Sequence, residues 1–334
     1  MIVFLIENNH FLLYKEVTRL LDAYLNIIVI FLLMFVGYWC SYRQWFSNRT
    51  ADVFSKIVLN LSLPFSMFLN ITHSFTREQF LSLFSGVLIP FISMILTLLF
   101  SFAYRKIFHI TKSRQGVFST MITCSNTIFI GLPINLAIFG EDSIPFVLLY
   151  YIMNTSIFWT IGVYLIAKDS PRIEEAHVSF HPLVALKKIF SPALIGFAIG
   201  VIWMLLSLKV PVLIQNFGNY LAELTTTLSM FAIGIMVYFN GIKNLKMNKD
   251  IVGVLIGRFL VAPLIVWILG FWIKVPTLML QVFIIQAAMP VQNSVPILAR
   301  SYQADEEFAA SSMGYSVLIY MLYIPVLLHL IYQM

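Results

Sequence analysis

The feature that most constrains this chain is a series of apolar runs, each long enough to cross a lipid bilayer. A helix needs about 17 to 25 residues to cross about 30 Å of hydrocarbon, and a chain that is 60% apolar and only 11% charged supplies many such runs. The runs do not alternate between apolar and polar residues, as membrane strands would. The sequence therefore predicts an all-α integral membrane protein with ten transmembrane helices. Their approximate ranges are 24–40, 51–71, 82–104, 114–138, 144–167, 188–208, 212–239, 250–272, 277–299 and 308–331.

The distribution of basic residues supports this number of spans. Lys and Arg in short loops favour the cytoplasmic side. With both termini outside, fifteen basic residues fall inside, five fall outside and Arg258 lies within a span, which accounts for all 21. The net charge of +6 then reflects topology and anionic lipid headgroups, so no nucleic-acid partner is expected. We expect a multi-pass protein of the plasma membrane.

The chain contains signs of an internal repeat. Ser66-Met67-Phe68 recurs as Ser229-Met230-Phe231, and Pro133 recurs as Pro296, each at a separation of 163 positions. Because five spans in each half is an odd number, the two halves would have opposite orientations, as in many transporters. The predicted divisions are an N-terminal extension 1–22, a first five-helix repeat 23–168, a cytoplasmic linker 169–186 and a second five-helix repeat 187–334.

The fourth and ninth spans each carry helix-breaking residues near the middle. Proline removes an N–H donor and clashes with the carbonyl four residues earlier, and backbone groups freed in hydrocarbon must find other partners. We expect the two unwound segments to cross near the midplane, where the N-termini of the following half-helices suit a carboxylate. The expected crossover residues are Gly131, Pro133, Pro290 and Pro296, and the polar residues beside them are Asn126, Thr127, Gln292 and Asn293.

Further polar residues in the spans are weaker candidates for the same site. Asn60 precedes a proline in the second span, and Asn154 and Thr155 lie in the fifth. These residues are candidates to face the crossover, although Asn and Thr also bond between membrane helices in ordinary packing.

Two charged residues lie deep within the spans, away from their ends: Glu223 in the seventh and Arg258 in the eighth. At about 1.5 Å per residue their depths nearly coincide, and an intramembrane charge normally has a partner. The sequence therefore predicts an ion pair between them. It would be either a static strut, a latch between two moving domains or a proton-coupling carboxylate.

Several of these segments resemble the auxin efflux carrier family, which includes plant PIN-FORMED carriers and bacterial malate and malonate permeases. The resemblance extends from the second span to the tenth. The matching segments are Asn126-Thr127-x-x-x-Gly131-x-Pro133, Arg258-Phe259-Leu260-x-x-Pro263, and Gln286-Ala287-Ala288-Met289-Pro290 with Pro296 and Tyr302.

The resemblance implies a bile-acid-symporter-like or NhaA-like fold. Helices three to five and eight to ten would form a moving transport domain, while helices one, two, six and seven would form a scaffold that dimerises. By the same resemblance, Asn126 would contact a substrate carboxylate, with Pro133 and Pro296 at the crossover. No acidic residue stands beside the crossover to supply a coupling site.

The predicted function is secondary transport of small organic anions, such as malate or malonate, by elevator-type alternating access. The alternatives are a sodium-coupled symporter, an exporter of auxin-like aromatic acids, and a channel or structural membrane protein. No enzyme motif is present, and the two cysteines stand apart from any metal-ligand pattern, so neither a cofactor nor a metal is expected. The expected partners are the anion, membrane lipid and a second copy of the chain.

Overall fold

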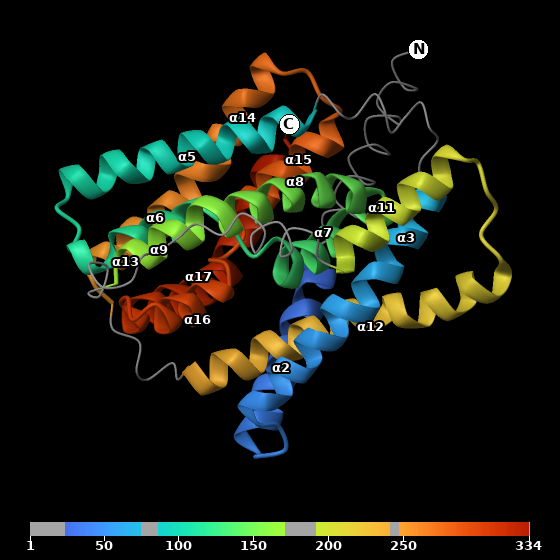
Figure 1. Ribbon diagram of the computed structural model, residues 1–334, viewed down its shortest axis with the longest axis horizontal. Helices are drawn as coiled ribbons and strands as arrows, with labels where there is room; N and C mark the ends of the chain where they lie inside the picture. Colours follow the sequence, from blue (N-terminus) through green and yellow to red (C-terminus); the bar gives the residue numbers. More distant parts are fainter. Residues whose placement is uncertain (1–23, 75–85, 171–191, 241–246, 334) are drawn as a thin grey trace, which may run out of the picture.

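The computed structural model describes residues 24–74, 86–170, 192–240 and 247–333, and these residues are almost entirely helical (Figure 1). Within these ranges, seven helices are long and apolar enough to cross a membrane, and three shorter apolar helices accompany them. No strand occurs in the described ranges, where the only extended pairing is one isolated bridge. The chain is thus a multi-pass helical membrane protein. The predicted extension 1–22 and most of the predicted linker 169–186 lie outside the described residues.

Of the seven long helices among the described residues, four are single α-helices and three consist of consecutive helical elements. The first helix is Tyr24–Tyr42. The other elements of the first half are α2 (Asn48–Ile57), η1 (Val58–Ser62), α3 (Leu63–Ser74), α5 (Leu88–Ile107), η3 (Lys112–Arg114), α6 (Gln115–Thr123), η4 (Thr127–Gly131), α7 (Leu132–Phe139), η5 (Glu141–Ser143), α8 (Ile144–Ile157), η6 (Phe158–Gly162) and α9 (Val163–Lys168). Those of the second half are α11 (Pro192–Leu205), α12 (Val212–Asn240), α13 (Lys249–Ile256), η8 (Gly257–Val261), α14 (Ala262–Trp272), α15 (Thr277–Ala287), α16 (Ser294–Ser301) and α17 (Glu306–Ile331).

The elements η1, η4, η6 and η8 are single π-helical turns. Three of them end two residues before a proline, at Pro64, Pro133 and Pro263. A proline ring crowds the carbonyl four residues earlier, and a wider turn with bonds from residue i to i+5 relieves that crowding. The sequence thus explains why the turns widen at these places.

The helices form two groups (Figure 1). One contains α2, α3, α11 and α12, and α3 packs closely against both α11 and α12. The helix Tyr24–Tyr42 crosses α12 at Gly37 and Gly234, where an added Cβ on either glycine would overlap the backbone of the other helix. Glycine is required at this crossing because the two backbones touch. The second group contains α5, α6, α8, α9 and α13 to α17, with Figure 1 showing α5, α6, α9 and α13 side by side.

Two helices of the second group are interrupted. Extended chain separates α6 from η4 at residues 124–126, and residues 288–293 separate α15 from α16. The first break therefore precedes the position expected at Gly131 and Pro133, and that part of the prediction was wrong. Pro133 instead stands in the first turn of α7, as Pro296 stands in the first turn of α16. In a first turn the missing N–H has no helical partner to lose.

Candidate functional site

The two breaks are joined to each other by their backbones. Ser125 and Val291 form an antiparallel bridge, and the N–H of Asn126 donates to the carbonyl of Pro290 over 2.8 Å. Backbone groups inside a membrane must be bonded within the protein. Each break therefore supplies partners for the other. We call residues 124–126 with 288–293 the junction.

Side chains from neighbouring helices satisfy further backbone groups of the junction. The amide of Asn154 on α8 accepts from Ser125 N–H at 2.9 Å and donates to Ser125 O at 3.0 Å. On α17, Ser316 Oγ accepts from Val291 N–H at 3.1 Å. These contacts fix the extended segments against the helices that follow them in the chain.

Gln286, on the last turn of α15, ties the two interrupted helices together. Its carbonyl accepts from Ser125 Oγ at 2.9 Å, and its side-chain Nε2 donates to Thr127 O at 3.2 Å. Gly131 faces this side chain, and a Cβ added at Gly131 would overlap Gln286 Oε1. Gly131 is thus needed for close packing beside the junction rather than for unwinding the helix.

A cavity of about 380 Å³ lies beside the junction, between the two helix groups. None of its lining residues is charged. The predicted residues Asn60, Asn126, Thr127, Gln292 and Asn293 all line it. The remaining lining residues are Leu59, Ile128, Phe129, Tyr151, Thr155, Trp159, Pro192 and Ser294.

The other predicted site residues lie outside the lining of this cavity. Pro290 lies within the junction, and Gly131, Pro133 and Pro296 belong to the helical segments that follow the two breaks. Asn154 was expected to line the cavity, but both ends of its amide are bonded to the backbone of Ser125. Its structural role is to hold the break in place.

The ion pair predicted between Glu223 and Arg258 is absent, and that prediction was wrong. Arg258, on η8, is completely buried, and its bonds go to main-chain carbonyl oxygens. Glu223 lies on an exposed part of α12. Counting residues along two helices gives their depth in a membrane, whereas packing sets the lateral distance between side chains at that depth.

The sequence reasoning missed the aromatic wall of the cavity. Tyr151 and Trp159 lie four residues before and after Thr155, which was identified as a candidate, and Phe129 follows Thr127 on η4. Residues four apart share one face of a helix. That spacing was the signal that indicated the two aromatic neighbours of Thr155.

Two half-helices begin at this cavity. Asn126 is the N-cap of η4, where its Oδ1 accepts from Phe129 N–H at 3.2 Å, so its Nδ2 group is the part of the amide that can donate to a ligand. Asn293 precedes α16 and makes no capping bond with its side chain. N–H groups at a helix start carry partial positive charge and bind anions. The site can therefore bind an anion without a cationic side chain in its wall.

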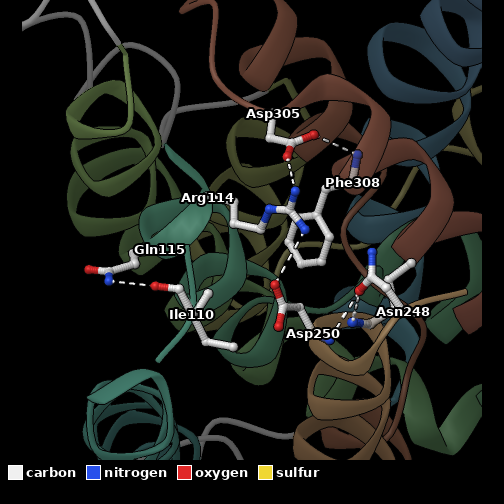
Figure 2. Close-up of polar contacts among 8 residues, drawn as sticks. Ile110, Arg114, Gln115, Asn248, Asp250, Asp305 and Phe308 are labelled. Atoms are coloured by element: carbon white, nitrogen blue, oxygen red, sulfur yellow. Dashed lines mark hydrogen bonds and ion pairs between the residues drawn. The ribbon is translucent and has the colours of Figure 1, made fainter. Parts of the chain in front are cut away.

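A second polar cluster joins one end of α6, α13 and α17 (Figure 2). The guanidinium of Arg114 contacts Asp250 at 3.3 Å and Asp305 at 2.8 Å, and it stacks over the Phe308 ring at 5.0 Å. Asp305 also caps α17, because its Oδ1 accepts from Phe308 N–H at 2.9 Å. One side chain thus connects the starts of three helices. Sequence reasoning missed this role of Arg114.

Asp169 attaches a fourth helix to the same end of the group. It directly follows α9, and its two oxygens accept from the N–H groups of Gly116 and Val117 at 2.8 Å each. Burial raises the pKa of the Asp169 carboxyl to about 6, against the opposing effect of the two N–H bonds and of Arg105. This carboxyl thus accepts from two backbone N–H groups in the first turn of α6, which have no partner within the helix.

Interrupted helices that meet at an uncharged polar cavity, within a multi-pass helical membrane protein, define a membrane transporter. A family model described as membrane transport protein matches residues 22–328, and the chain belongs to this family, that of the auxin efflux carriers.

Relatives in bacteria, archaea and plants agree with this assignment. The uncharacterized transporter YfdV of Escherichia coli is 24% identical, over 90% of this chain and 95% of its own. An uncharacterized transporter of Methanocaldococcus jannaschii is 23% identical, over 86% and 92% of the two chains. Auxin efflux carrier component 8 of Arabidopsis thaliana is 22% identical, over 64% and 72%.

Proposed function

We propose that this chain is a secondary transporter of small organic anions, mono- or dicarboxylates such as malate or malonate. The observation that carries the proposal is the cavity at the junction. Its wall contains seven Asn, Gln, Ser or Thr side chains from the interrupted helices and their neighbours and no charged side chain, and two half-helices begin there. A carboxylate is the ligand that such N–H groups and amides favour.

The proposed mechanism is elevator-type alternating access. The group of helices that carries the junction would move as a body against the group formed by the first helix, α2, α3, α11 and α12. Arg114 and Asp169 support this proposal, because they connect α6, α9, α13 and α17 at one end and so favour joint movement. In this arrangement the ten spans form two inverted five-helix repeats, and the scaffold group carries the contact between two copies.

The proposed location is the plasma membrane, with both termini outside. The cavity reaches Pro192, the first residue of α11, which follows the loop expected on the cytoplasmic side. The conformation is then an inward-facing one, in which the anion exchanges with the cytoplasm.

A second candidate substrate class is aromatic weak acids. Three aromatic side chains, Phe129, Tyr151 and Trp159, contribute to the cavity wall, and they suit a ligand with a flat apolar body beside its carboxylate. One relative is an auxin efflux carrier component. Measurements with indole-3-acetate and benzoate separate this class from malate and malonate.

The test is counterflow in proteoliposomes, together with thermal shift of the purified protein, across malate, malonate, lactate, benzoate and indole-3-acetate. The amide of each acid serves as the neutral control. We expect saturable counterflow for at least one acid and none for its amide. Counterflow that does not saturate, or equal uptake of acid and amide, contradicts the proposal.

The site assignment is tested with Asn126→Ala and Asn126→Asp. A hydrogen bond to a charged group contributes about 1.5 to 3 kcal/mol, so Asn126→Ala should weaken binding of the transported acid about 10- to 150-fold. Asp keeps the capping oxygen but places a negative charge in the cavity, so Asn126→Asp should remove binding while the protein stays folded. Asn216→Ala, at an exposed position on α12, is the control. Unchanged affinity in both Asn126 variants would refute the assignment.

A further inference from the structure

We propose that Arg258 acts as a fixed cation at the junction, in the place where a co-transported cation such as Na⁺ would otherwise bind, so that the transporter operates without sodium. The part of this inference that concerns transport rests on the proposed function. The part that concerns the cation position rests on the geometry of Arg258 alone.

The guanidinium of Arg258 is surrounded by backbone oxygens of both interrupted helices. Its Nη1 donates to Ile122 O at 2.6 Å, its Nε donates to Met289 O at 3.2 Å, and its Nη2 donates to Ala287 O. Ile122 lies in the last turn of α6, Ala287 is the last residue of α15, and Met289 is in the break that follows. The buried guanidinium therefore donates hydrogen bonds to carbonyls at the C-terminal ends of both α6 and α15.

The charges at this point balance without a carboxylate. The C-terminus of a helix carries a partial negative charge equivalent to about half an elementary charge, so two such ends together match one guanidinium. No ion pair involves Arg258 among the described residues, and the titratable groups that act on it are Tyr150 and Cys124. Burial of an arginine is costly unless its charge is compensated, and here the helix ends provide that compensation.

The same oxygen atoms are suitable ligands for a small inorganic cation. Transporters with interrupted helices bind Na⁺ or H⁺ at unwound carbonyls and at the C-terminal ends of half-helices. Main-chain carbonyls also replace the hydration shell of monovalent cations in channels. In this chain the three carbonyls are already occupied by a side chain that cannot leave.

The fixed charge is connected to the anion cavity through the backbone. Met289 accepts a bond from Arg258, and the next residue, Pro290, accepts from the N–H of Asn126, which lines the cavity. The positive charge thus lies directly behind the half-helix starts that face the anion. The site gains a permanent positive potential that a symporter would obtain only after it had bound its cation.

The decisive measurement is the dependence of the melting temperature on the cation, in nanodiscs and without any organic acid. Wild type should melt at the same temperature in NaCl, KCl and choline chloride of equal ionic strength. Arg258→Ala leaves the three carbonyls open, so Na⁺ should raise its melting temperature saturably, by roughly 2 to 5 °C at ten times the dissociation constant. Arg258→Lys keeps a fixed charge and should remain indifferent to Na⁺.

Arg300→Ala is the control, because Arg300 is an exposed arginine whose contact with Glu306 is long, at 3.9 Å, and it should behave as wild type. A wild type that Na⁺ stabilises, or a folded Arg258→Ala variant with one melting temperature in all three salts, overturns the proposal. If Arg258→Ala does not fold, Arg258→Gln takes its place in the same comparison.

Should neither variant fold, the counterflow assay with wild type decides. A requirement for Na⁺ overturns the proposal, and equal rates in NaCl and choline chloride support it. A failure of every acid in the counterflow panel would refute the proposed function and leave the salt comparison intact.

Discussion

Replacement of Asn154 by leucine should destabilise the protein by leaving the buried backbone N–H of Ser125 without a hydrogen-bond partner. The amide of Asn154 bonds to the N–H and to the carbonyl of Ser125 at 2.9 and 3.0 Å, and both residues are completely buried. Leucine has a similar shape but no hydrogen-bonding atom. The carbonyl of Ser125 also accepts from Thr127 N–H at 3.0 Å and so keeps a partner, whereas the N–H of Ser125 does not. A buried backbone group left without a partner costs about 1 to 3 kcal/mol, so Asn154→Leu should lower the free energy of unfolding by about 1 to 3 kcal/mol.

The change should also reach the anion site, because Ser125 is the neighbour of Asn126. Thermal melting in nanodiscs measures the stability, and the shift produced by the transported acid measures the site. Asn154→Asp retains an acceptor for the Ser125 N–H and should lie between wild type and Asn154→Leu. Asn216→Leu, on an exposed part of α12, is the matched control and should melt close to wild type.

Two results would refute this reasoning. If Asn154→Leu melts like wild type, the Ser125 peptide does not depend on the amide. If its stability is unchanged but acid binding is lost, Asn154 contacts the substrate, as its position in the sequence first indicated.

Three further predictions concern the packing and the charged end of the same helix group. Gly131→Ala should cost about 1 to 3 kcal/mol in the free energy of unfolding, because the new methyl overlaps Gln286 Oε1; the double variant with Gln286→Ala should recover part of that loss. Arg114→Ala should lower the melting temperature by leaving the buried Asp250 without its counter-ion, and Arg114→Lys should restore it only in part because lysine lacks the planar fork. Asp169 has a folded-state pKa raised to about 6, so the protonated carboxyl is favoured in the folded state and its stabilisation is lost as pH rises through 6. Wild type should therefore gain stability relative to Asp169→Asn as pH falls from about 7 to about 4, by roughly 2 to 3 kcal/mol.

Each of these has a clear contrary outcome. Equal melting of Gly131→Ala and wild type means that the Gln286 side chain moves away at no cost. Equal melting of Arg114→Ala and wild type means that the carboxylates at that end find other partners. Parallel pH curves for wild type and Asp169→Asn mean that burial does not raise the pKa.

The helical membrane architecture could be predicted from the sequence because the length of an apolar run is a direct physical requirement of the bilayer. The interruption of the fourth and ninth spans was also predictable, since glycine, proline and amides have few other reasons to occur there. The exact position of the first break was not. Pro133 is compatible with the first turn of a helix, so the chain unwinds earlier, at Asn126, where a side chain caps the new start.

For the candidate site, sequence reasoning located residues that the structure brings together at one cavity, and their role in binding stays a prediction. Asn126, Gln292 and Asn293 lie in the breaks and Thr127 directly follows one, and all four line the cavity. It failed for Arg258, whose partners are backbone carbonyls that no sequence pattern identifies. It also missed the aromatic wall. The four-residue spacing links Tyr151 and Trp159 to Thr155, but which face of that helix meets the cavity depends on the packing of two helix groups.

The π-helical turns have a consequence for how such helices are compared. A π-turn holds one more residue than the α-helical turn it replaces, so the residues after it are displaced by about 100° relative to an uninterrupted α-helix. In the long helices that contain η1, η6 and η8, the side chains after the π-turn are therefore rotated about the helix axis relative to those before it. A single hydrophobic face drawn through Val58–Ser62 or Phe158–Gly162 is therefore out of phase on one side of the turn. Removal of one residue within such a turn should leave both flanking faces in register, whereas the same deletion elsewhere in these helices would rotate the rest of the span out of its contacts.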